Sequence, residues 1–62
     1  MTLTIELTDI STDQVLALAQ FVKRVNYNEM RPNAENNTEA EHMFTAFSKL
    51  QDALAQAGYA PR

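Results

Sequence analysis

Residues 2–7 read Thr2-Leu3-Thr4-Ile5-Glu6-Leu7. Polar and apolar side chains alternate along this stretch, which predicts a β-strand with the three apolar side chains on one face and the three polar ones on the other. We expect this to be the only strand of the chain. A lone strand leaves backbone N–H and C=O groups unpaired. Residues 2–7 are therefore expected to pair outside the chain, with a second copy or with another protein.

A first helix is predicted from Thr12 to Val25. Ser11, followed three residues later by Gln14, fits a capping box at its start. Apolar residues recur along this segment at the spacing of one helix face, and they are Val15, Leu18, Ala19, Val22 and Val25. Residues 26–37 hold five asparagines and Pro32. This composition favours a loop with room for a short helical turn.

A second helix is predicted to begin at the capping box Thr38-Glu39-Ala40-Glu41 and to end before Gly58. Glycine suits the left-handed C-cap position at that end. The apolar stripe of this helix follows heptad spacing and consists of Met43, Phe47, Leu50, Leu54 and Ala57. Phe44 lies about 60° away from the stripe, at 100° per residue.

The order strand, helix, loop, helix predicts one α+β domain over residues 1–62, with the helices packed as an antiparallel hairpin. In this arrangement the helices bury Leu3, Ile5 and Leu7 of the strand. A chain of this size buries only about 60% of its unfolded surface. Because the sequence has no cysteine, neither disulfides nor a thiolate metal site can stabilise it. Oligomerisation is the remaining common device, so we expect a homodimer formed through residues 2–7.

The sequence offers little for catalysis or for a cofactor. It has no cysteine, one glycine and a single histidine, His42, for which no pocket is predicted. Glu39 and His42 lie one helical turn apart, as in carboxylate-bridged helical bundles, but the first helix adds no acidic residue on its apolar face. We predict no enzyme activity, no cofactor and no metal site, and leave open an adventitious ion at His42. No apolar run approaches the roughly 20 residues of a membrane span, so a cytoplasmic protein is expected.

DNA binding is the alternative function. Strand, helix, helix is also the order of ribbon-helix-helix repressors, whose paired strands enter the major groove. In this chain Thr2 and Thr4 would read bases, with support from Lys23 and Arg24. Eight acidic residues against five basic ones give a net charge of −3, and this charge opposes the approach of phosphates.

Protein–protein interaction is the leading prediction. Tyrosine and arginine are enriched at interface hot spots, and strand edges supply main-chain hydrogen bonds to partners. The residues expected to contact a partner lie on the outer strand face or outside the helix stripes, and they are Thr2, Thr4, Glu6, Leu16, Tyr27, Arg31, Phe44 and Tyr59. For Tyr27 and Tyr59 the competing interpretation is that they cover the open ends of a small core.

Three segments resemble a family of very short proteins from bacteria, phages and other mobile elements, and they are residues 4–9 (TIELTD), 18–24 (LAQFVKR) and 53–62 (ALAQAGYAPR). The family has no assigned activity, so the resemblance transfers no site residue. It implies that the protein acts by occupying a host protein, in the manner of anti-CRISPR inhibitors. If the target binds nucleic acid, we expect acidic residues to compete for its phosphate sites, and these are Glu35, Glu39, Glu41 and Asp52.

Overall fold

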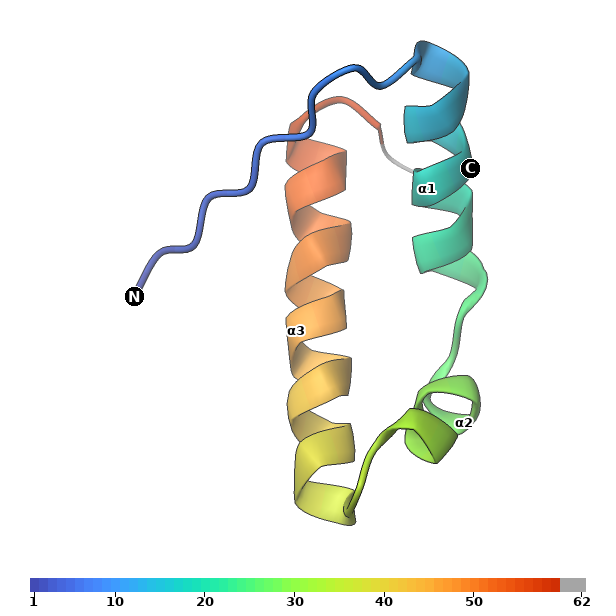
Figure 1. Cartoon of the computed structure of the whole chain (residues 1–62), viewed down its shortest axis with the longest axis vertical. Coiled ribbons are helices and arrows are strands. Elements are labelled where there is room, and N and C mark those ends of the chain that lie inside the picture. The colour runs from blue at the N-terminus through green and yellow to red at the C-terminus, as the bar shows by residue number, and fades with distance from the viewer. Residues whose placement is uncertain (60–62) are drawn as a thin grey trace.

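The computed structural model describes residues 1–59 and contains two long helices that lie side by side and run in opposite directions (Figure 1). The first is α1 (Thr12–Arg24) and the second is α3 (Asn37–Gln56). The connection between them holds the four-residue helix α2 (Tyr27–Met30) and the 3-10 turn η1 (Arg31–Asn33). Within residues 1–59, no helix has both the length and the apolar character that crossing a membrane requires.

The predicted strand is absent: residues 1–59 contain helices, turns and bends but no β-strand. Residues 1–8, which we call the N-terminal arm, leave the start of α1 and extend past α3 (Figure 1). Within the described residues the arm makes no backbone hydrogen bond. The α+β prediction was therefore wrong. Alternating side chains indicate an extended backbone, whereas a strand also needs a neighbouring strand, and residues 1–59 supply none.

A left-handed residue sets the direction of the arm. Asp9 has a φ of 54°, the only positive φ among the non-glycine residues that the structure describes. Aspartate tolerates this conformation better than most residues because its short polar side chain bonds locally. The bend at Asp9 lies two residues before the N-cap of α1, so it separates the arm from the helical body.

The predicted start of α1 is confirmed. The backbone N–H of Gln14 donates to Ser11 Oγ over 3.1 Å, and the backbone N–H of Ser11 donates to Gln14 Oε1 over 2.9 Å. These two bonds form the reciprocal capping box. The helix ends at Arg24, one residue earlier than predicted, because Val25 is extended and serves as the C-cap.

The predicted start of α3 was wrong by two residues. Asn36, not Thr38, is the N-cap, and its Oδ1 accepts from the backbone N–H of Glu39 over 2.8 Å. Glu39 Oε1 in turn accepts from the backbone N–H of Glu35 over 3.1 Å. Asparagine is a stronger N-cap than threonine, so the earlier residue begins the helix. The end of α3 agrees with the prediction, since Gly58 has a φ of 95°.

The core is small and lies where the helices meet. The buried apolar residues of the described chain are Ala19, Val22, Met30 and Ala40. The prediction that the helices bury the apolar residues of the arm was wrong, since Leu3, Ile5 and Leu7 are 74%, 68% and 55% exposed. The buried set comes from the helices alone, and the arm adds no side chain to it.

Candidate protein-interaction surface

Large apolar side chains are unusually accessible in this molecule. Within residues 1–59 nine are exposed, from the arm, both long helices and the segment that joins arm and helix, namely Met1, Leu3, Ile5, Leu7, Ile10, Leu16, Phe21, Phe44 and Leu50. Single exposed apolar residues are ordinary, but contiguous apolar patches mark interaction sites. The arrangement of these residues therefore decides where a partner can bind.

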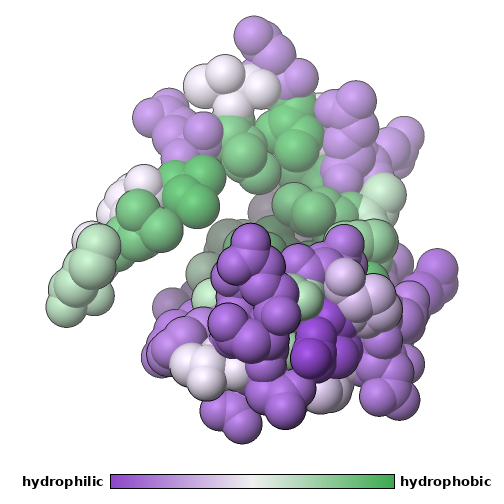
Figure 2. All heavy atoms as spheres, turned by 60° about the horizontal axis from the view of Figure 1, so that its bottom comes forward, coloured by the Kyte–Doolittle hydropathy of each residue, from purple (hydrophilic) through white to green (hydrophobic). Residues whose placement is uncertain are grey.

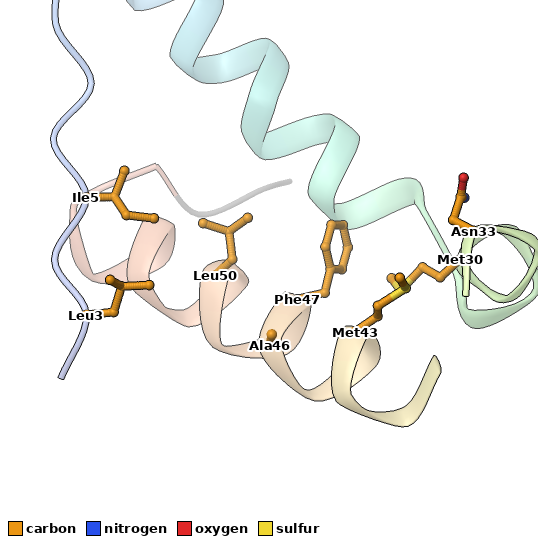
Figure 3. Close-up of a pocket in the computed structure, with 8 residues that line it drawn as sticks. All are labelled: Leu3, Ile5, Met30, Asn33, Met43, Ala46, Phe47 and Leu50. Atoms are coloured by element: carbon orange, nitrogen blue, oxygen red, sulfur yellow. The ribbon is translucent and has the colours of Figure 1, made fainter. Parts of the chain in front are cut away.

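An apolar concavity lies between the arm and α3, and we call it the arm–α3 groove. It has a volume of about 510 Å³ and is open to solvent. Its lining comes from the arm, the connection and one face of α3, and consists of Leu3, Ile5, Met30, Asn33, Met43, Ala46, Phe47 and Leu50 (Figure 3). Figure 2 shows the arm as a row of hydrophobic residues standing away from the helical body, with a hollow between them.

The face of α3 that lines the groove is the continuation of its buried stripe. Met43, Ala46, Phe47 and Leu50 follow the spacing i, i+3, i+4, i+7, which places them on one side of the helix. Met43 and Phe47 are partly buried, whereas Leu50 is 39% exposed. The stripe is therefore wider than α1 can cover. Sequence reasoning assigned these residues to the core and missed the groove.

Leu3 and Ile5 form the opposite wall of the groove. Both side chains point from the arm toward α3, on the side where Leu50 lies (Figure 3). Asn33 is the one polar lining residue, and its amide donates to the backbone carbonyl of Glu29 over 3.2 Å. The groove thus presents apolar carbon surface without a charged group. Thr2, Thr4 and Glu6, which were predicted to meet a partner, are exposed on the same arm.

A second apolar feature is a pair of aromatic rings. The rings of Tyr27 and Phe44 contact each other edge to face, with centroids 5.9 Å apart and planes at 72°. This geometry is the favourable one for aromatic pairs. Tyr27 is partly buried, and Phe44 is 46% exposed. Phe44 is not a lining residue of the groove; around α3 it lies about 120° from Leu50 and about 60° from Phe47.

Leu16 does not join the aromatic pair. Gln51 Nε2 donates to the backbone carbonyl of Val22 over 2.7 Å, and this bond places Val22 level with Gln51. Leu16 is six residues before Val22 on a helix that runs opposite to α3, and Phe44 is seven residues before Gln51. At 1.5 Å per residue, Leu16 and Phe44 are about 20 Å apart along the bundle axis.

Arg31 and Tyr59 contribute to local structure. Arg31 Nη1 donates to the backbone carbonyl of Ala34 over 3.2 Å, and Arg31 Nε donates to Asn37 Oδ1 over 2.9 Å. These bonds connect η1 to the first turn of α3. Tyr59 is partly buried, and its backbone N–H donates to the carbonyl of Leu54 over 2.9 Å.

Acidic residues and His42 are dispersed. Within residues 1–59, no three histidine or acidic side chains gather in a way that could hold a metal ion. Glu39 Oε1 accepts from the backbone N–H of Glu35, so this carboxylate takes part in capping α3. His42, Glu35, Glu41 and Asp52 are all exposed. Glu41 lies three residues before Phe44 and thus borders the aromatic pair.

Comparison with known protein families gives a match over the full length of the chain. The whole chain, residues 1–62, matches a family of unknown function, DUF7706. No curated protein and no solved structure matches the sequence.

Proposed function

Because the chain belongs to DUF7706, a family of unknown function, its own surface is the guide to its activity, and we propose that it is a non-enzymatic protein-binding module. The observation that carries the proposal is the Tyr27–Phe44 contact, which holds a phenylalanine ring in place while leaving it 46% exposed. Binding orders side chains at a cost in free energy, and an aromatic ring that is already held loses less freedom when it enters a pocket.

The partner that suits this surface is a host protein with an apolar pocket beside basic groups. Glu41 is exposed on the turn before Phe44, so an aromatic anchor and a carboxylate lie together on α3. Of the four acidic residues considered from the sequence, Glu41 is the one next to the anchor. A basic surface of this kind occurs on nucleic-acid-binding proteins, where a carboxylate competes with phosphate.

The biological setting that we propose follows from the family resemblance of the sequence. The protein acts in the cytoplasm, is carried by a phage or another mobile element, and inhibits a host complex as anti-CRISPR proteins do. Its small size and net charge of −3 are consistent with occupying a basic site. We do not extend the proposal to DNA, because residues 2–7 form no strand that would enter a groove.

Site-specific cross-linking in host cells tests this proposal. A photoreactive phenylalanine analogue at position 44 is expected to capture one host protein, which mass spectrometry identifies. The same analogue at Phe21, which is 60% exposed on α1, is the control and is expected not to capture it.

Calorimetry with the purified host protein then measures affinity. Phe44→Ala is expected to weaken binding at least about thirtyfold, the size of a hot-spot truncation, whereas Phe21→Ala changes it less than about twofold. Glu41→Gln is expected to weaken binding more at low salt than at high salt, because salt screens exposed charges. Equal losses for both phenylalanines, or capture only from position 21, would overturn the proposal.

A further inference from the structure

The surface area of this chain is too large for a compact monomer. A folded monomer of 7.0 kDa exposes about 4,000 Å² by the usual scaling with mass. This chain exposes 5221 Å². The excess of about 1,200 Å² exceeds the roughly 800 Å² that each partner buries in a standard protein–protein interface. One interface of ordinary size would therefore bring the chain to the surface expected of a folded protein.

Exposed apolar side chains lie on the arm and across the arm–α3 groove from it. Leu3, Ile5 and Leu7 are all more than half exposed, and Leu50 across the groove is 39% exposed. Short chains without cysteine commonly complete their core by association. The groove has no charged lining residue, so the occupant that fits it is an apolar, extended segment.

The chain itself carries such a segment. We infer that a second copy occupies the groove, and that each copy of a twofold dimer places its arm in the groove of the other. Leu3 and Ile5 already point at the α3 wall of their own groove but leave it open (Figure 3). Apolar arm side chains that can pack against the α3 wall of their own chain can pack equally well against the identical α3 wall of a second chain. Exchange of identical elements is a low-cost route to dimers.

Two features of the arm permit this exchange. Within residues 1–59 the arm makes no backbone–backbone hydrogen bond, so its release from the described part of the chain breaks none. The left-handed bend at Asp9, with its φ of 54°, sets the arm apart from α1 and gives it a hinge. Thr2, Thr4 and Glu6 are exposed and do not line the groove, so exchange does not require burying these polar groups in it.

Sedimentation equilibrium of the whole chain tests the oligomeric state. Over about a hundredfold range of concentration the expected result is conversion of the 7.0 kDa monomer into a species of twice that mass. Leu50→Asp is expected to abolish the dimer, because it places a charge in the groove. Asp52→Leu, which lies about 160° from Leu50 around α3, is the control and is expected to leave dimerisation intact. A wild-type chain that stays monomeric throughout overturns the inference.

Disulfide trapping tests the placement of the arm, and the natural absence of cysteine makes the result unambiguous. One chain carries Ile5→Cys, and a second, isotopically labelled chain carries Leu50→Cys. Oxidation of the mixture is expected to give the mixed disulfide at least about tenfold more than a control mixture with Thr4→Cys, whose side chain points the other way.

The outcomes separate this inference from the proposed function. Equal trapping from positions 4 and 5 overturns the exchanged arm, even if the chain dimerises. A monomeric chain that still loses its host partner through Phe44→Ala overturns the dimer and leaves the proposed function standing. A chain that dimerises, but whose binding to the host protein is unchanged by Phe44→Ala, overturns the proposed function and leaves the dimer standing.

Discussion

Gln51 of α3 closes the exposed end of α1: its Nε2 donates to the backbone carbonyl oxygen of Val22 over 2.7 Å. Val22 is among the last four residues of α1, whose carbonyls have no partner within the helix. The bond therefore satisfies a helix terminus and joins two helices that are 29 residues apart in sequence. No pattern of apolar residues could have identified this contact.

Gln51→Glu is expected to destabilise the fold at neutral pH by about 1–3 kcal/mol, because a carboxylate cannot donate to the Val22 carbonyl. A protonated glutamic acid can donate, so the folded state raises the pKa of the introduced group above its unfolded value of about 4.3. The contribution of the bond is then fully present below the unfolded pKa and is lost as the pH rises through the folded pKa. Urea unfolding from pH 4 to pH 8 measures this. Gln51→Ala is the control, because alanine cannot titrate. If the stability lost through Gln51→Glu were as independent of pH as the stability lost through Gln51→Ala, the prediction would be contradicted.

The cap of α3 gives a second prediction. Asn36→Ala is expected to cost about 1 kcal/mol of unfolding free energy, because Asn36 Oδ1 is the group that accepts from Glu39. Thr38 lies inside the first turn of the helix. Thr38→Ala is therefore expected to cost no more than a few tenths of a kcal/mol of unfolding free energy. Thermal unfolding followed by circular dichroism compares the two. If Thr38→Ala were the more damaging change, the helix would begin at Thr38 after all.

The C-terminal end of α3 gives a third prediction. Gly58→Ala is expected to destabilise by about 1 kcal/mol, the cost of a Cβ in left-handed backbone. The loss comes from the φ of 95° alone, because a Cβ at Gly58 would meet no atom within 4 Å. Gly58→Asn is expected to cost less, since asparagine tolerates this conformation. Chemical denaturation of the three chains ranks them. Equal stability of Gly58→Ala and the wild type would show that the C-cap is formed in another way.

The helices could be predicted from the sequence because their signals are local. The capping box at Ser11, the apolar periodicity and the glycine at position 58 each act within a turn of helix. The arm could not be predicted from alternation, because a strand depends on hydrogen bonds to a neighbour that this pattern does not specify. The Asn36 cap was missed because the Thr38–Glu41 motif also satisfied the local rule.

The groove was missed for a different reason. A stripe of apolar residues on α3 predicts a buried face, but the width that is buried depends on the partner helix. Ala40 is fully buried, whereas Leu50 on the same stripe is 39% exposed. The apolar spacing along α3 is the same for a stripe residue that is buried and for one that is exposed. Only the structure therefore distinguishes a core residue from a residue of the interaction surface. Among the residues expected to meet a partner, Tyr27 and Phe44 are brought together, whereas Leu16 lies far from them.

The 120° between Phe44 and Leu50 around α3 has a consequence for affinity. Phe44 is not a lining residue of the groove, so a dimer joined through its grooves, as inferred above, would present two Phe44 rings and would be bivalent. A target with two equivalent sites at a matching distance would be held by avidity, because the second anchor binds at the high effective concentration set by the first. A target with a single site would gain nothing from dimerisation. Together, the proposed dimer and the proposed Phe44 anchor predict selectivity for repeated or symmetric targets.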